Sequence, residues 1–181
     1  MSNKIATLED AIIYATRQHE GTTRKQSVIP YILHPLEALL LLTEMDADLN
    51  LMMAGVLHDT VEDTDATCEE IRELFGEDVA ELVSAHTEDK SKTWKERKTH
   101  TIEELAIADV RMKKLVLADK LANLRSMDRD YQKVGEHLWD RFNAPKESQA
   151  WYYHGIIQGL NELAEREETA PIYQEMVELY Q

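Results

Sequence analysis

The sequence predicts an all-α protein, a single compact multi-helix bundle built around a mononuclear metal site. Apolar residues recur at helical spacing along most of the 181 residues, and no segment shows the period-two alternation typical of a strand. Helix-start patterns and glycine stops divide the chain into segments of ordinary helix length. One apolar segment, 51–57, runs directly into four titratable side chains, His58, Asp59, Glu62 and Asp63. This last observation indicates the metal site.

The N-terminal part of the chain predicts two helices joined by a polar segment. The first begins after Thr7 and runs to about Glu20, where Gly21 ends it. Pro35 suits the first position of the second helix, which runs to about Glu44. We therefore expect His34 to lie at the start of that helix.

The next helix, from Asp48 to about Asp63, is apolar nearly all round and should be buried. At about 100° per residue, His58 and Glu62 share one face of it, and Asp59 and Asp63 share the adjoining face. Buried charges need partners or a metal ion. The last turns of this helix therefore predict a metal-centred hydrolytic site.

The rest of the chain also has a helical pattern. A capping box at Thr67 opens a short helix that Gly76 stops.

Asp119 and Asn123 lie in the middle of an apolar stripe, where a carboxylate is as unexpected as in the buried helix. The further helices are expected at 77–86, 94–105, 110–127 and 131–142, then from 143 through Leu160, and at 172–179, with a loop at 87–93.

Composition limits the possible functions. The chain is 43% hydrophobic and 30% charged, with Cys68 as its only cysteine, so neither a disulfide framework nor a cysteine-rich zinc module is expected. It shows no signal peptide and no membrane-spanning run, which favours a cytoplasmic location. The net charge of −15 argues against binding to nucleic acid or to an anionic membrane. It leaves a small anionic substrate possible, since a cation can reverse the local potential. The sequence does not indicate an oligomeric state.

Two histidines and two aspartates could surround one cation: His34, His58, Asp59 and Asp119. Mixed imidazole and carboxylate ligation suits manganese, iron or zinc better than calcium or magnesium. A cation there can activate a water molecule for attack on phosphorus. Glu62 and Asp63 are not needed as ligands and are placed to orient that water and to move protons.

Several motifs resemble those of a known family. Their order and spacing are similar to those of the HD-domain phosphohydrolases, in particular the alarmone hydrolase domain of the Rel/Spo proteins and its stand-alone small relatives. The resemblance covers about the first three quarters of the chain. The matching motifs are Thr23–Lys25, Pro30–Pro35, Leu57–Thr64, Glu88–Lys90, Trp94–Lys98 and Leu117–Arg125.

The resemblance implies one HD-type domain over residues 1–181, with about 145–181 as C-terminal helices that complete a nucleotide cleft. It implies a manganese-dependent 3′-pyrophosphohydrolase that converts guanosine tetra- or pentaphosphate (ppGpp or pppGpp) to GDP or GTP and pyrophosphate. Iron and zinc are alternatives for the metal. The implied metal ligands are His34, His58, Asp59 and Asp119, and the catalytic acids are Glu62 and Asp63. The implied substrate contacts are Arg24 and Lys25 for the base and a phosphate, Asn123 for the ribose, Lys98 and Arg141 for further phosphates, and Tyr152 beside the nucleotide.

Two other hypotheses stay open at this point. The same centre could act on another nucleotide, such as ppApp, NADPH or a nucleoside monophosphate, because Thr22 and the segment from Gln26 to Ile29 depart from the family pattern. Alternatively, the chain could be a non-catalytic module that only binds the alarmone. The pair Glu62 and Asp63 favours an enzyme, since a pure binder has no need of it. For the other histidines, including His19 and His86, an ordinary core role is favoured.

Overall fold

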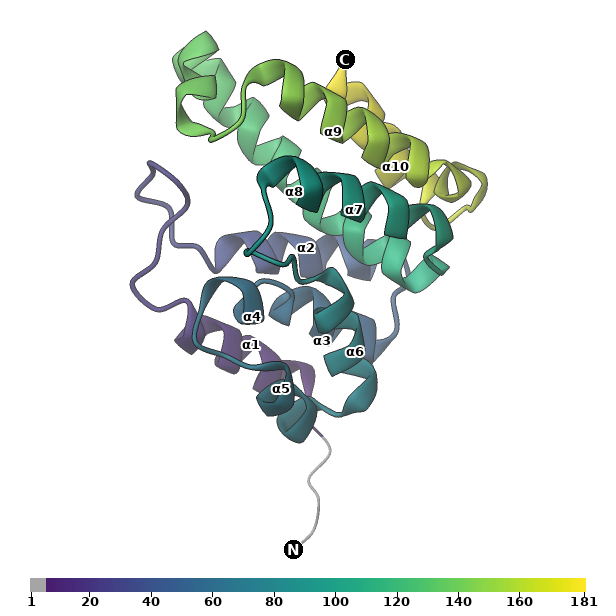
Figure 1. Cartoon of the computed structure of the whole chain (residues 1–181). Helices are drawn as coiled ribbons and strands as arrows, with labels where there is room; N and C mark the ends of the chain where they lie inside the picture. Colours follow the sequence, from purple (N-terminus) through teal and green to yellow (C-terminus); the bar gives the residue numbers. More distant parts are fainter. Residues whose placement is uncertain (1–5) are drawn as a thin grey trace, which may run out of the picture. The chain divides into compact units, whose positions relative to one another are not determined.

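The computed structural model describes residues 6–181 and confirms the all-α class (Figure 1). Outside the helices, backbone pairing of the strand type in this range consists of an isolated bridge between Thr23 and Pro30. The chain divides into two compact units, one up to Thr87 and one from Glu88. The single domain over 1–181 that the sequence predicts stays a prediction.

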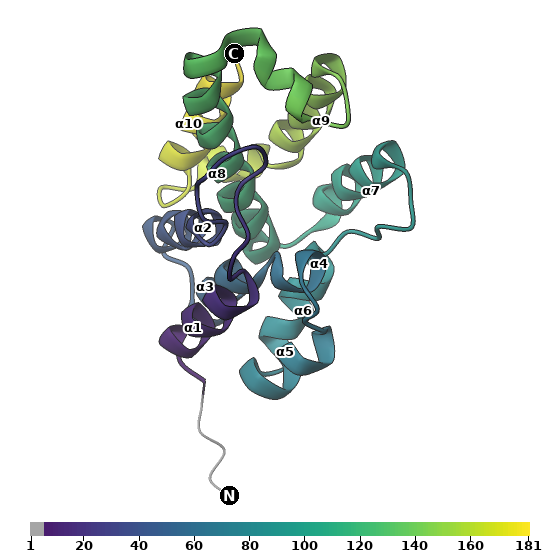
Figure 2. The ribbon, with the colours of Figure 1, turned by 90° about the vertical axis from the view of Figure 1, so that its left-hand side faces the viewer.

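The first unit is arranged around α3 (Leu49–Leu57). This helix packs against α1 (Leu8–Gln18), α2 (Leu33–Glu44) and α6 (Glu77–His86), and α6 also packs against α5 (Cys68–Phe75) (Figures 1 and 2). As its all-round apolar pattern predicts, α3 is buried from Leu51 to Leu57 except for Met52. The end of α3, where the titratable residues begin, is therefore fixed by packing on several sides.

Three predicted helix starts are confirmed in this unit, whereas α2 begins at Leu33, two residues before the predicted first position at Pro35. Thr7 and Asp10 form a reciprocal capping box at α1, Asp48 caps α3, and Thr67 caps α5. Gly76, with φ of 93°, ends α5 in a conformation that a residue with a Cβ rarely adopts.

The prediction of one continuous helix from Asp48 to Asp63 is wrong in one respect, because the helix breaks at His58 and Asp59. A separate turn, α4 (Thr60–Asp63), follows the break. The side chains of His58 and Thr60 bond the carbonyls of Gly55 and Leu57, both at 2.7 Å. These are the acceptors that a continuous helix would use for the N–H groups four residues later, so side chains compete here with the helical pattern.

The second unit contains two helix pairs. Helix α7 (Trp94–Ile107) packs against α9 (Lys146–Gly159), and α8 (Val110–Val134) packs against α10 (Ala170–Tyr180). Short 3₁₀ segments connect them, η1 (Gly135–Arg141) and η2 (Asn161–Glu165).

Two boundaries in this unit differ from the sequence prediction. Helix α8 continues past Met127 to Val134, where Gly135 ends it with φ of 57°. The segment expected as a helix over 131–142 is therefore divided between the last turn of α8 and η1. Gly135 is the reason, since it stops one helix and starts a tighter one.

Between residues 6 and 181, none of the helices combines the length and apolar character needed to cross a membrane.

Candidate active site

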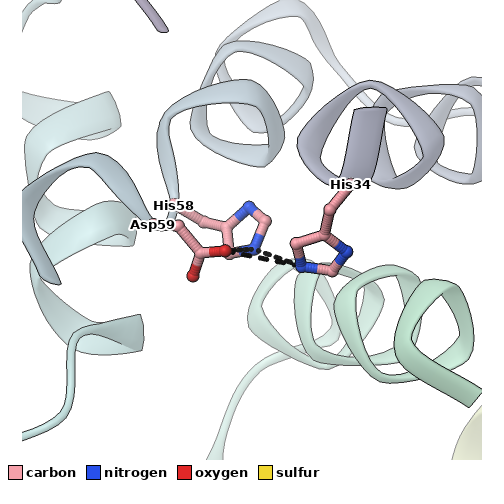
Figure 3. A group of neighbouring side chains, drawn as sticks. All are labelled: His34, His58 and Asp59. Carbon is pink, nitrogen blue, oxygen red and sulfur yellow. Dashed lines mark hydrogen bonds and ion pairs between the residues drawn. The ribbon is translucent and has the colours of Figure 1, made fainter. Parts of the chain in front are cut away.

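Three of the predicted ligands converge in the first unit. His34 comes from the first turn of α2, and His58 and Asp59 come from the break between α3 and α4. Asp59 Oδ2 lies 3.2 Å from His58 Nε2 and 3.4 Å from His34 Nε2, and the two nitrogens are 3.3 Å apart. Figure 3 shows the three side chains turned toward one another.

The tautomer of His58 follows from its second nitrogen. Its Nδ1 lies 2.7 Å from the carbonyl oxygen of Gly55, an acceptor, so Nδ1 carries the proton and Nε2 presents a lone pair. That lone pair faces His34 Nε2 and the carboxylate of Asp59, an arrangement that a shared cation stabilises. Ligand atoms at right angles around a cation about 2.1 Å away lie about 3 Å apart. The three observed distances fit a divalent metal ion.

One of the two predicted catalytic acids, Asp63, lies beside this cluster, and Glu62 precedes it in the turn α4. Tyr31 Oη is 2.7 Å from Asp59 Oδ2 and 3.1 Å from Asp63 Oδ2, so the two carboxylates lie on one side, as their helical spacing predicts. Exposure rises across the site. His34 and His58 are buried, the Asp59 side chain is 15% exposed, and Asp63 is exposed. The acids therefore form the solvent side of the centre, where a water molecule and a substrate can enter.

The segment between α1 and α2 carries Arg24 and Lys25. It is closed at its base by the bond from Tyr31 N–H to the carbonyl of Thr22 and by the bridge between Thr23 and Pro30. The guanidinium of Arg24 lies 5.6 Å from the centre of the Tyr31 ring, and Lys25 is exposed. The structure thus places the Arg24 side chain next to the residue that touches the acids.

The fourth predicted ligand, Asp119, belongs to the second unit, near the middle of α8. It is buried and accepts hydrogen bonds from Asn123 Nδ2 at 2.8 Å and from Lys120 Nζ at 2.6 Å. Sequence spacing predicts the contact with Asn123, one turn further on. A buried carboxylate held by an ammonium and an amide is fixed in orientation.

Lys98 lies in a cluster of partly buried charges in the second unit. Its Nζ is 2.6 Å from Glu88 Oε1, and Arg97 also approaches Glu88, at 3.5 Å. Burial would raise the pKa of Glu88, but Lys98, Lys120 and Arg97 hold it below its usual value. The pKa of Lys98 is lowered by its burial and by the like charge of Lys120. The cluster brings three cations, Arg97, Lys98 and Lys120, beside two acids, Glu88 and Asp119, an arrangement that suits the binding of an anion.

Tyr152 lies over the same cluster and is buried. The Lys98 ammonium is 4.9 Å from the centre of its ring, and the Lys120 ammonium is 5.8 Å from it. The Tyr152 hydroxyl is enclosed, and burial raises its pKa although the nearby Lys120 ammonium acts to lower it. Arg141, by contrast, is paired with Asp130 at 2.7 Å, near the end of η1.

Three side chains beside the first-unit cluster, His86, His19 and Tyr31, are not among the site residues that the sequence predicts, and a core role is favoured there for the two histidines. The ring of His86 meets that of His58 edge-on at 5.2 Å, and the ring of His19 lies on that of Tyr31 at 4.7 Å. His86 and His19 show no distinguishing pattern in the sequence, because their neighbours come from other helices. Tyr31 lies inside the family motif from Pro30 to Pro35, and this motif is the feature of the sequence from which a role for Tyr31 could have been predicted.

Comparison with known proteins identifies relatives. A family model described as HD domain matches residues 11–147. Human guanosine-3′,5′-bis(diphosphate) 3′-pyrophosphohydrolase MESH1 is 39% identical over 132 residues, which cover 71% of this chain and 74% of that protein. The bifunctional (p)ppGpp synthase/hydrolase SpoT of Escherichia coli is 37% identical over 131 residues. This match covers 69% of the chain but 18% of SpoT, and the other long relatives are spanned to a similar small extent.

A solved structure resembles nearly the whole chain. It is described as a metazoan ortholog of SpoT that hydrolyzes ppGpp and plays a role in starvation responses. Its TM-score is 0.78 with 31% sequence identity, over 99% of this chain and 97% of that one.

Proposed function

Because the chain belongs to the HD-domain family, we propose that it hydrolyses the 3′-pyrophosphate of ppGpp and pppGpp, releasing pyrophosphate and GDP or GTP. The observation that carries the proposal is the convergence of His34, His58 and Asp59 with the carboxylate of Asp63 beside them. The similarity to MESH1 over about three quarters of its length supports the choice of substrate.

The proposed metal set is His34, His58, Asp59 and Asp119, with manganese as the ion. The mixed nitrogen and oxygen donors support a manganese, iron or zinc site over a calcium site. When bound, the ion supplies a Lewis acid that polarises a phosphoryl oxygen and lowers the pKa of water. Asp119 is included because it lies in the matching motif and because its buried carboxylate has a fixed orientation.

The acids and the cations have separate proposed roles. Glu62 and Asp63 orient the attacking water and exchange protons with it, and the exposure of Asp63 supports this assignment. Arg24 and Lys25 hold the base and a phosphate, and Lys98 and Arg141 bind further phosphates. Asn123 contacts the ribose, and Tyr152 lies beside the nucleotide. The three cations of its cluster, Arg97, Lys98 and Lys120, beside only two acids support the role of Lys98. The proposal includes a cytoplasmic location, where nucleotide pools lie.

The test is hydrolysis by purified protein loaded with Mn²⁺ across ppGpp, pppGpp, ppApp, NADPH and nucleoside monophosphates, with products separated by anion exchange. We expect GDP and pyrophosphate from ppGpp, with loss of turnover on chelation. Glu62→Gln should lower kcat by about 10²-fold or more, the size of a general acid–base contribution, without unfolding the protein.

Glu73→Gln is the matched control, since Glu73 is an exposed acid on α5 with no role in the site, and it should leave kcat unchanged. Turnover of another nucleotide alone would keep the catalytic centre and overturn the substrate. Tight ppGpp binding without turnover of any nucleotide would make the chain a binding module and contradict the proposal.

A further inference from the structure

The hydroxyl of Tyr31 lies between two acids that have different proposed roles. Oη is 2.7 Å from Asp59 Oδ2 and 3.1 Å from Asp63 Oδ2. Asp59 Oδ2 is also the oxygen that approaches His34 and His58. One phenolic group thus contacts both the carboxylate oxygen of the metal cluster and the neighbouring acid.

The Tyr31 ring is fixed by aromatic and cationic neighbours. It lies on the His19 ring at 4.7 Å with the planes inclined by 31°, and it meets the His34 ring edge-on at 6.0 Å. The Arg24 guanidinium lies 5.6 Å from the ring centre. His19 is buried, its Nε2 finds no hydrogen-bond partner among the described residues, and burial lowers the pKa of its imidazole. The ring of His19 therefore packs against the ring of Tyr31 and helps to fix its position.

The backbone fixes Tyr31 as well. Its N–H donates to the carbonyl of Thr22 at 3.0 Å, and its own carbonyl accepts from the N–H of His34 at 2.9 Å. The second bond joins Tyr31 to the first turn of α2, which carries a metal ligand. With ring and backbone both held, the hydroxyl has little freedom to leave the acids.

The phenol has one proton and faces two carboxylate oxygens. The shorter distance assigns its hydrogen bond to Asp59. Asp63 Oδ2, at 3.1 Å, stays beside the same hydroxyl. Ligating carboxylates are commonly held by such outer hydrogen bonds, which fix the direction of the ligand oxygen.

We propose that Tyr31 is a positioning residue that sets the rotation of the Asp59 carboxylate toward the metal and keeps Asp63 next to it. The proposal rests on the proposed function for the identity of the reaction and on the hydrogen-bond geometry for the role. Tyr31 acts through Asp59 and Asp63 and makes no contact of its own with the reacting atoms. The same ring carries the Arg24 side chain, so one residue links the segment from Thr22 to Pro30 with both acids.

The test is Tyr31→Phe in the full chain, which keeps the ring and removes only the hydroxyl. We measure the Kd for Mn²⁺ alone by calorimetry, then kcat and KM for ppGpp, and the thermal unfolding midpoint. We expect the Kd for Mn²⁺ to rise about tenfold and kcat to fall about 10- to 100-fold, the effect typical of an outer partner of a metal ligand. KM should change by less than about threefold, because the substrate contacts stay.

Tyr14→Phe is the matched control. Tyr14 is a tyrosine of the same unit whose ring packs on Phe75 at 5.5 Å, and its loss of a hydroxyl should leave metal affinity and kcat unchanged. A purely structural role for Tyr31 predicts a lower unfolding midpoint with kcat and Mn²⁺ affinity intact in the folded fraction, and that result would overturn the proposal. Wild-type metal affinity and kcat in Tyr31→Phe, or no Mn²⁺ binding by the wild type, would overturn it as well.

The metal measurement separates this proposal from the proposed function. If the wild type hydrolyses no nucleotide but Tyr31→Phe still weakens Mn²⁺ binding about tenfold, the proposed function fails and the positioning role stands. If ppGpp is hydrolysed and Tyr31→Phe changes neither kcat nor Mn²⁺ affinity, the function stands and the positioning role fails.

Discussion

Burial of the Lys98 charge costs free energy, and its ion pair with Glu88 recovers part of that cost. Its side chain is 17% exposed and that of Glu88 is 13% exposed, so both charges have lost most of their water. The bond between them, at 2.6 Å, offsets that loss. A ligand phosphate would compete with Glu88 for the same ammonium.

Replacing Lys98 with Met should therefore have two separable effects. Glu88 keeps its charge and loses its nearest partner, so the free energy of unfolding should fall by about 1–3 kcal/mol. KM for ppGpp should rise about 10-fold or more, because a charged hydrogen bond to phosphate contributes about 1.5–3 kcal/mol. Urea unfolding and steady-state kinetics measure the two effects.

The double variant Lys98→Met with Glu88→Gln separates them. It removes the Glu88 carboxylate, which has lost its nearest partner, and should recover most of the lost free energy of unfolding, while KM for ppGpp stays high. Recovery of KM together with stability would contradict a direct role of Lys98 in substrate binding.

At the scale of helices, α7 and α9 approach each other closely through two glycines. A Cβ at Gly155 would fall on the side chain of Ile102, and a Cβ at Gly159 would lie 2.9 Å from Leu105 Cδ2. Gly155 and Gly159 are one turn apart on α9, and because they have no side chain, α7 can pack closely against this face. The absence of a side chain is thus a packing requirement here.

Gly155→Ala tests this packing. Helix propensity alone would stabilise α9 by about 1 kcal/mol. The clash with Ile102, which is β-branched and adjusts poorly, should outweigh that gain and destabilise the protein by a net of about 1–2 kcal/mol. Thermal unfolding measures the change, with Gln158→Ala on the exposed side of α9 as a control expected to be nearly neutral. An unfolding midpoint above that of the wild type would show that the helices can separate.

Helix starts could be predicted well from the sequence, but one helix interruption could not. Capping residues such as Thr7, Asp48 and Thr67 act within their own turn, so the local sequence contains the information. The break at His58 depends on side chains that bond the carbonyls of Gly55 and Leu57, and an apolar periodicity does not register such bonds. The aspartates at 59 and 63 still lie together, because α4 restores helical spacing directly after the break.

For the molecule as a whole, metal binding should add measurable stability, since an unfolded chain offers no assembled ligand set. At a concentration about 100 times the Kd, Mn²⁺ should stabilise the folded state by about 2.7 kcal/mol. For a chain of this length that corresponds to a rise in Tm of about 5–10 °C, which differential scanning fluorimetry measures and which chelation should reverse.

Asp119→Asn should reduce this rise by at least half if Asp119 is the fourth ligand. Asp128→Asn is the control on the same helix, where Asp128 accepts a bond from Gln132 at 2.9 Å, and it should keep the full rise. An equal rise in both variants would remove Asp119 from the ligand set. Failure of Mn²⁺, Fe²⁺ and Zn²⁺ to change Tm would contradict the metal site itself.

The candidate site could be predicted in part, by residue type and spacing. Two histidines and an aspartate in apolar surroundings indicate a shared cation, and the structure brings His34, His58 and Asp59 together. The contacts of Tyr31 with His19 and Asp59 join residues 12 and 28 positions apart, and no local pattern indicates such pairs. The roles assigned to the site residues, those of Asp119, Arg141 and Tyr152 included, stay predictions that rest on the family resemblance and on the chemistry of each side chain.

The segment from Thr22 to Pro30 is tied at its base, and this has an evolutionary consequence. The bonds that close it join Thr22, Thr23, Pro30 and Tyr31, while the side chain of Val28, between these ends, is 93% exposed. Insertions, deletions and substitutions around Val28 can accumulate without displacing Tyr31 or the acids that it touches. Descendants of such a protein could thus acquire new nucleotide preferences through drift in a few loop codons, while the hydrolytic machinery is inherited unchanged.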